Sequence, residues 1–172
     1  LFAYGGHANV LIEGVQKGPF GPSFITMGCE KELSISMEHK LKLRNNGTLP
    51  AFASIVFERT KLSDFTMLDS LVVEPTQARI DPGRSVEVKV RFKATKAESR
   101  KILSMNKDVT IIGEICIICG DEPTRLRILQ GKDNVEPRFL EYLPKVLPGQ
   151  TDLLAKLLKF KEELTRDKLT SI

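Results

Sequence analysis

Cys116 and Cys119 are the residues whose type and spacing could most readily do chemistry, because two thiols separated by two residues occur in zinc sites and redox pairs. The surrounding run, V-T-I-I-G-E-I-C-I-I-C, is rich in β-branched residues and predicts a strand over residues 109–118. Residues three apart on a strand point to opposite faces, so these two sulfurs would not bind the same metal ion or form a redox pair. We therefore expect buried structural thiols, with a metal or redox pair as the less favoured alternative.

The two histidines are the other candidates for catalysis, which needs a nucleophile or an acid–base group with a positioned partner. His39 falls on the same side of its predicted strand as Met37 and Leu41, which indicates a core or sheet-edge position. His7 lies near a predicted strand start. The sequence contains no nucleophile elbow, phosphate-binding glycine loop or EF-hand loop. We expect no catalytic residues, no cofactor, no metal and no enzyme.

Two segments that alternate apolar and polar residues give the clearest structural prediction. A period of two means a strand with one buried face and one wet face, which is typical of antiparallel sandwiches. In each segment the apolar side is predicted to face the core: Leu33, Ile35, Met37, Leu41 and Leu43 in the first, and Val86, Val88, Val90 and Phe92 in the second.

Further strands are predicted over residues 7–15, 51–57, 71–73, 109–118 and 124–130, and a short helix over residues 97–105. Asn45-Asn46-Gly47 and Asp81-Pro82-Gly83 are turn sequences. About seven strands with this spacing predict a mainly β protein, an immunoglobulin-like antiparallel β-sandwich.

The character of the chain changes after Gly131, where a C-terminal helical extension is predicted. The first part is a short helix or apolar segment over residues 136–143, and a longer helix opens at Thr151. We divide the chain into an N-terminal strand or linker (1–19), the sandwich (20–131) and the helical extension (132–172).

The outer faces of the two alternating strands carry six basic side chains: Lys40, Lys42, Arg44, Lys89, Arg91 and Lys93. If the strands are sheet neighbours, these form one basic face, diluted by Glu38 and Glu87. Such a face is either a solvated surface that prevents aggregation or a site for an acidic or phosphorylated peptide. Nucleic acid is disfavoured because aromatic side chains for base stacking are missing from these faces.

The predicted C-terminal helix offers a second surface, since an apolar helical stripe must bury against something. It either folds back on its own domain or pairs with a partner helix or a second copy. Its anchors would be Leu153, Leu157, Phe160 and Leu164.

The composition of the chain disfavours nucleic-acid-binding, membrane and secreted proteins. The 172 residues carry a net charge of +4, which is too balanced to indicate nucleic acid, and no apolar run approaches the roughly 20 residues of a membrane span. We see no signal peptide, and three cysteines indicate a reducing compartment. We expect a cytoplasmic protein with protein partners and no membrane or small-molecule substrate.

Several of these residues resemble the ASH domain, named for abnormal-spindle, spindle-defective and Hydin proteins. They are Asn45-Asn46-Gly47 with Ala51 and Phe52, followed by the pattern V-x-P-x-x-x-x-I-x-P-G-x-S-x-x-V-x-V-x-F over residues 73–92. ASH domains are related to major-sperm-protein and pilus-chaperone (PapD-like) folds. The segment Y-G-G-H-A-N-V-L-I-E-G resembles the last strand of such modules in the centrosomal spindle-defective scaffold family.

The resemblance implies a non-enzymatic scaffold at the centrosome, within the cytoskeleton, that recruits pericentriolar material for centriole duplication and spindle formation. It also implies partners among centrosomal scaffold or coiled-coil components, including self-association. The alternative is a cytosolic major-sperm-protein-type adaptor that reads acidic or phosphorylated peptides on the basic sheet face.

Overall fold

The computed structural model describes residues 5–17, 23–58 and 70–150. Over these residues the elements are, in chain order, β1 (Val10–Glu13), β2 (Gln16–Lys17), β3 (Ser23–Phe24), the 3-10 helix η1 (Glu30–Glu32), β4 (Met37–Asn45), β5 (Ala51–Glu58), β6 (Leu71–Glu74), β7 (Gln77–Ile80), β8 (Ser85–Phe92), α1 (Lys96–Ser104), β9 (Glu114–Asp121), α2 (Glu122–Leu129) and α3 (Pro137–Leu140).

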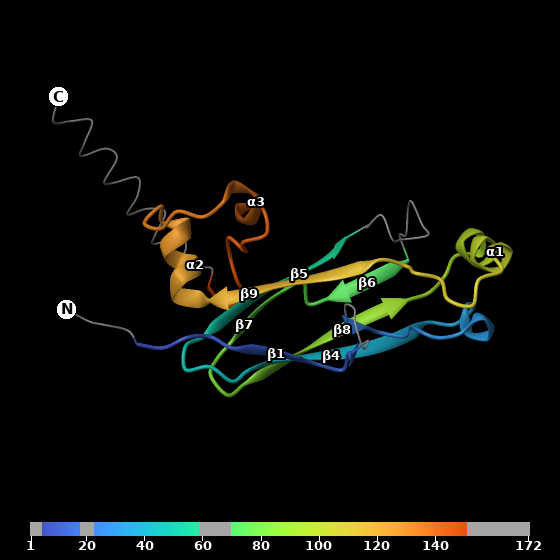
Figure 1. Cartoon of the computed structure of the whole chain (residues 1–172), viewed down its shortest axis with the longest axis horizontal. Helices are drawn as coiled ribbons and strands as arrows, with labels where there is room; N and C mark the ends of the chain where they lie inside the picture. Colours follow the sequence, from blue (N-terminus) through green and yellow to red (C-terminus); the bar gives the residue numbers. More distant parts are fainter. Residues whose placement is uncertain (1–4, 18–22, 59–69, 151–172) are drawn as a thin grey trace, which may run out of the picture.

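The strands form the predicted antiparallel sandwich. One sheet has four strands in the order β1-β4-β8-β6, and the facing sheet has three in the order β7-β5-β9. A short hairpin of β2 and β3 stands beside them. Figure 1 shows α1 at one end of the sandwich and α2 with α3 at the other. The mainly β fold class, with helices after the last strand, is therefore confirmed.

The two alternating segments pair with each other as β4 and β8. Leu41 lies opposite Val88, and Lys40 lies opposite Lys89. Because a one-residue shift in register would turn every side chain to the other face, this pairing decides which residues the core receives. The second turn behaves as predicted too, since Gly83 adopts φ +73° after Pro82.

The main core lies between the two sheets. The inner faces of β4 and β8 meet small and branched residues from β5, β6 and β7, and the side chains that make this contact are Leu41, Leu43, Ala51, Ala53, Ile55, Val73, Ala78, Ile80, Val88 and Val90. Alanines on β5 and β7 let the sheets approach closely, since packed interiors leave little empty space.

Asn45, fully buried at the end of β4, ties the two sheets together. Its side-chain amide donates to the carbonyls of Leu49 at 2.8 Å and Ile80 at 2.9 Å. Its carbonyl oxygen accepts from the N–H groups of Gly47 at 2.9 Å and Asn9 at 3.2 Å. These four bonds satisfy the whole hydrogen-bonding capacity of an asparagine side chain. A Cβ on Gly47 would meet the His7 carbonyl at 2.3 Å, so this turn requires glycine.

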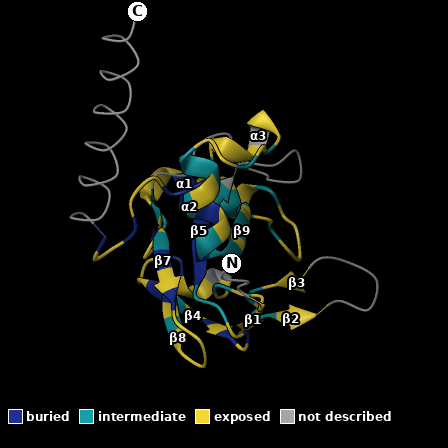
Figure 2. Cartoon of the chain, turned by 90° about the vertical axis from the view of Figure 1, so that its left-hand side faces the viewer, coloured by how far each residue is buried: buried dark blue, intermediate teal, exposed yellow. Residues whose placement is uncertain are grey.

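The outer face of the second sheet is covered, which explains why β5 is apolar on both sides. Phe52 points away from the main core and packs against Leu143 and Leu147, with Ile128 beside them. We call residues 141–150 the strap. Figure 2 shows α2 and α3 on the side of β5 and β9 that faces away from β4 and β8.

A buried charged network holds the strap on α2. Arg125 is fully buried, and its Nε and Nη2 donate to the two carboxylate oxygens of Glu122 at 2.6 and 2.7 Å. Nη1 donates to the carbonyl of Pro144, and Nη2 also donates to Gln150 at 2.7 Å. Gln150 in turn donates to Glu122 at 2.6 Å. Buried charges survive only when they are paired and hydrogen-bonded in this way.

The strand predicted over residues 124–130 is wrong, because residues 124–129 belong to helix α2 and Gln130 is its C-cap. The run T-R-L-R-I-L-Q alternates in hydropathy and so resembles a strand, yet Pro123 sits in the first turn of a helix, where proline is well tolerated.

The first alternating strand begins later than predicted. Residues 33–36 precede β4, and Ile35 is 56% exposed although it was expected to face the core. The 3-10 helix η1 and the hydrogen bond from the Ile35 N–H to the Glu32 carbonyl at 3.0 Å curl this segment out of the sheet. The last strand starts at Glu114, later than the predicted residue 109.

The N-terminal strand β1 joins the sandwich as an edge strand, pairing with β4 so that Ile12 lies opposite Leu43. The pairing makes residues 10–13 part of the four-stranded sheet, whereas the boundaries at residues 19 and 131 stay a prediction. The helix predicted from Thr151 lies outside the described residues, while α3 falls within the predicted apolar segment 136–143.

Leu43→Ala is expected to lower the free energy of unfolding by about 2–5 kcal/mol, because a fully buried leucine leaves a cavity. Leu11→Ala is the matched control, since Leu11 lies on the opposite face of the same strand pair and is 44% exposed. We expect it to cost under about 1 kcal/mol. Equal losses in urea unfolding would show that the register is wrong.

Arg125→Ala is expected to lower the free energy of unfolding by about 3–5 kcal/mol, because it leaves the buried Glu122 carboxylate without its partner. Arg127→Ala on the same helix is the control. Its side chain is 63% exposed and pairs with Asp133, so the loss should stay under about 1 kcal/mol. Urea unfolding checks both variants, and a neutral Arg125→Ala would contradict the role of the network.

Candidate protein-interaction surface

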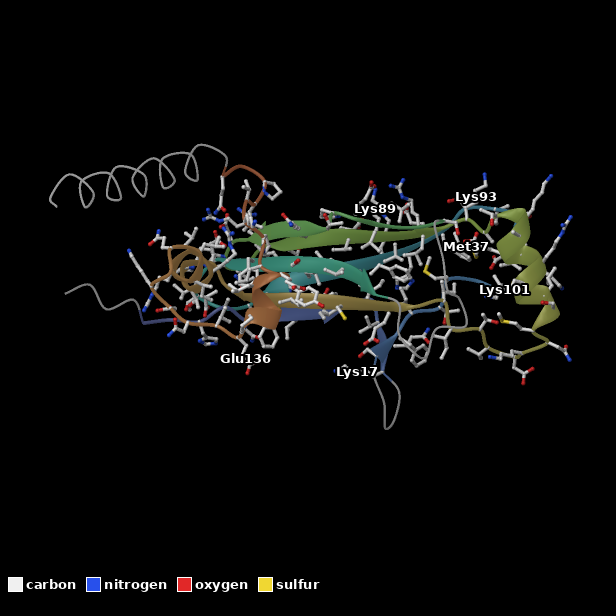
Figure 3. The ribbon with its side chains drawn as sticks, turned by 90° about the horizontal axis from the view of Figure 1, so that it is seen from above. Lys17, Met37, Lys89, Lys93, Lys101 and Glu136 are labelled. Carbon is white, nitrogen blue, oxygen red and sulfur yellow. The ribbon has the colours of Figure 1, made fainter. Side chains whose placement is uncertain are left out.

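The six basic residues predicted to share a face do so. Lys40, Lys42 and Arg44 alternate with buried residues on β4, and Lys89 and Arg91 do the same on β8. Lys93 follows the end of β8 and is exposed. Figure 3 shows Lys89 and Lys93 projecting on the same side of the molecule. The structure thus brings together all members of this surface, which we call the basic face.

Acidic residues neutralise part of the basic face. Lys40 pairs with Glu87 at 3.1 Å, Lys42 pairs with Glu13 at 3.4 Å, and Arg91 pairs with Glu74. Glu13 and Glu74 come from the neighbouring strands β1 and β6, and no sequence pattern indicated that these strands would flank β4 and β8. Exposed pairs of this kind contribute little to stability, but they lower the positive potential of the surface.

Three basic residues of the face make no ion pair with any other residue in the described ranges: Arg44, Lys89 and Lys93. Lys89 stands directly opposite Lys40 on β4 and opposite Glu74 on β6. Like charges placed opposite each other destabilise a sheet, so an anionic group that bound near Lys89 would relieve the repulsion.

A shallow groove of about 830 Å³ runs beside Lys89. One wall is formed by β6 and the turn after it, with Val72 exposed, and the other by the strap from Val146 to Gly149. A second hollow continues along the strap and shares Gln77 and Val146 with the first. Extended or helical segments of a partner use such open, partly apolar grooves.

The cysteines lie on opposite faces of β9, as the strand geometry predicted. Cys116 lies opposite Val56 and Cys119 opposite Ala53. Cys119 is exposed, so the expectation that it is buried is wrong; β9 is an edge strand and leaves it uncovered. Desolvation of its sulfur nevertheless raises the pKa of the Cys119 thiol, which disfavours the reactive thiolate.

The histidines serve structural hydrogen bonds. His39 is half-buried, and its Nε2 donates to the Gly14 carbonyl at 2.6 Å, which fastens the end of β1 to β4. The His7 carbonyl accepts from the Thr48 N–H at 2.9 Å. Within the ranges that the structure describes, no group of three or more His, Cys, Asp or Glu side chains could hold a metal ion.

Helix α1 is held firmly at the far end of the sandwich by a capping box. The Thr95 N–H donates to the Glu98 carboxylate at 2.6 Å, and the Glu98 N–H donates to the Thr95 hydroxyl at 3.2 Å. Ser70 donates to the same carboxylate at 2.7 Å. Burial raises the pKa of Glu98, but these hydrogen bonds outweigh it and hold the pKa below its usual 4.5.

The other predicted surface, the stripe formed by Leu153, Leu157, Phe160 and Leu164, lies outside the described residues. Its role stays a prediction. None of the helices in the described ranges has the length and apolar character that a membrane crossing needs.

Comparison with known families gives one match. A family model described as Cep192 domain 5 matches residues 23–146, which is well over half of the 172-residue chain. The matched range begins at β3 and covers every later element up to the strap, so it includes β4, β8 and the whole second sheet. A search of curated proteins finds no match.

Glu98→Ala is expected to lower stability in a pH-dependent manner. A carboxylate whose folded pKa is depressed stabilises the fold above its unfolded pKa, and the stability is lost as the pH falls through the folded value. The difference between wild type and variant should therefore be complete near neutral pH and shrink below about pH 4.5. Thermal unfolding across this range checks it, and a difference that grows in acid would contradict the assignment.

Proposed function

The chain belongs to the Cep192 domain 5 family, and from this membership we propose that it is a non-enzymatic protein-interaction module of a centrosomal scaffold. Cep192 is a centrosomal protein, and the family match is the observation that carries the proposal. The fold supports it, because a sandwich with one face covered by helices and the other exposed presents a stable surface to partners.

The finer role that we propose is recruitment and assembly of pericentriolar material, with effects on centriole duplication and spindle formation. The resemblance of residues 45–52 and 73–92 to ASH modules supports this role. A scaffold of this kind would use several shallow surfaces in parallel, since linked weak contacts give high avidity.

A second candidate function is an adaptor that reads acidic or phosphorylated peptides on the basic face. The specific observation in its favour is that Arg44 and Lys89 keep their charge unpaired within the described ranges, and that Lys89 lines the groove formed with the strap. Charge-assisted hydrogen bonds to carboxylate or phosphate would then supply the affinity.

Recruitment in cells tests the proposed function. The chain, fused to a fluorescent protein, should concentrate at centrosomes marked by γ-tubulin. The double variant Arg44→Glu, Lys89→Glu reverses two of the three unpaired charges, while Lys17→Glu, Lys132→Glu makes the same change of charge elsewhere; Figure 3 shows Lys17 and Lys89 on different sides. In the adaptor case the Arg44→Glu, Lys89→Glu variant should bind an acidic or phosphorylated peptide about tenfold more weakly than the wild type, which corresponds to ~1.4 kcal/mol.

The scaffold case predicts the reverse pattern. Leu157→Asp, in the predicted helical stripe, should abolish recruitment while the basic-face variant has little effect. Circular dichroism must show that every variant is folded. A wild-type fusion that stays evenly spread through the cytoplasm would contradict the centrosomal role.

A further inference from the structure

The α1 end of the sandwich exposes apolar side chains around a small second core. That core consists of Leu33, Met37 and Phe92, with Ile102 and Met105 packed against it. The segments that contribute to this core also carry some of the most exposed apolar residues in the described ranges, namely Ile35 (56%), Leu103 (50%) and Val109 (75%). Large apolar groups that gather in this way at one end of a fold indicate an interaction site.

Basic residues predominate on α1, the helix that carries one of these apolar side chains, Leu103. Between residues 93 and 107 the only acidic residue is Glu98, and Glu98 is buried in the capping box. Lys96 and Arg100 are exposed on α1, and Lys93 precedes the helix. Figure 3 shows Lys93 and Lys101 at the same end as Met37. We call Lys96, Arg100, Ile35, Leu103 and Val109 together the α1 patch.

The order of side chains on α1 indicates which side chains a partner helix would carry on its matching face. Lys96, Arg100 and Leu103 are spaced by four and three residues, so they form one row along the exposed side of the helix. A second helix that packs along this row would meet two positive charges one turn apart and then an apolar residue. Its matching face would carry glutamates one turn apart beside a leucine-type stripe.

We infer that the α1 patch binds an acidic amphipathic helix from a partner protein. This inference deepens the proposed function and rests on it, because it assigns the binding role to a surface separate from the basic face. The choice is supported by charge, since every exposed charged residue between positions 93 and 107 is basic.

An anionic membrane would also attract a basic and apolar surface, but the charges at this end disfavour it. Glu32 and Asp108 are exposed next to the segments that carry Ile35 and Val109. Against a flat anionic bilayer both carboxylates would face like charge, whereas a single helix can lie along α1 without meeting them.

Binding of a designed peptide to the whole chain tests the inference. The probe is a fluorescein-labelled helical peptide with leucines at spacings of three and four and glutamates flanking them. The control is a scrambled peptide of the same composition. Fluorescence anisotropy should show saturable binding of the probe, which weakens at least about tenfold when salt rises from about 0.1 M to 1 M, and no comparable binding of the scrambled peptide.

Variants locate the contact. Lys96→Glu, Arg100→Glu should weaken binding at least about tenfold, since two favourable contacts become repulsive, and Leu103→Ser about fivefold. Lys17→Glu, Lys132→Glu makes the same change of charge at exposed positions outside both the basic face and the α1 patch and should leave the affinity unchanged. Glu98 is kept in all variants, so the capping box remains and circular dichroism should not change.

The inference would be overturned by no binding of the probe, by equal binding of the scrambled peptide, by no weakening in Lys96→Glu, Arg100→Glu, or by equal weakening in the Lys17→Glu, Lys132→Glu control. Vesicles that contain phosphatidylserine provide the last arm, and binding to them with loss in Lys96→Glu, Arg100→Glu would replace the helix with a membrane. Failure is separable from the proposed function, because a fusion that still concentrates at centrosomes keeps the module role while the α1 patch loses its partner.

Discussion

Burial of the inner faces of β4 and β8 is the constraint on which the rest of the structure depends. Leu43, Val88 and Val90 are fully buried against the second sheet, and Leu41 is only 2% exposed. Since side chains alternate strictly along a strand, burying these residues forces every lysine and arginine between them onto the opposite face. The basic face is therefore a direct consequence of the core, and it remains in place as long as the register does.

In contrast to the exposed outer face of the first sheet, the outer face of the second sheet is covered. Its outer face carries Phe52, which is closed off by the strap, and the strap is fixed through the Glu122–Arg125–Gln150 network. The sandwich consequently has one covered side and one open side, with α1 as a separate surface at one end. This division would let a scaffold of the kind that we propose hold more than one partner at once.

Local pattern was enough to predict the strands whose periodicity is strong. β4 and β8 alternate over many residues, and the turns at Asn45 and Gly83 carry turn-specific residues, so these elements followed from the sequence, whereas their pairing was expected only on the condition of an immunoglobulin-like fold. Helix α2 could not be predicted in this way, because a short run with alternating hydropathy fits the period of a strand as well as that of a helix. Asp121 as N-cap, followed by Glu122-Pro123, was the signal that could have identified the helix.

Contacts between distant segments could not be predicted. Glu13 and Glu74 reach the basic face only because β1 and β6 flank β4 and β8, and strand order is a property of the whole topology. Cys119 is exposed for the same reason, since only the sheet order shows that β9 is an edge. The sequence thus predicted the six basic residues of the face correctly but overestimated its net charge.

The register of β4 against β8 tests the central claim most directly, and nuclear magnetic resonance can measure it in solution. The account predicts cross-strand nuclear Overhauser effects that pair Leu41 with Val88 and Lys40 with Lys89, together with slow amide exchange along both strands. Effects that pair Leu41 with Glu87 or Lys89 instead would show that the register is shifted by one residue. The basic residues of one of the two strands would then face the core, and the account would be contradicted.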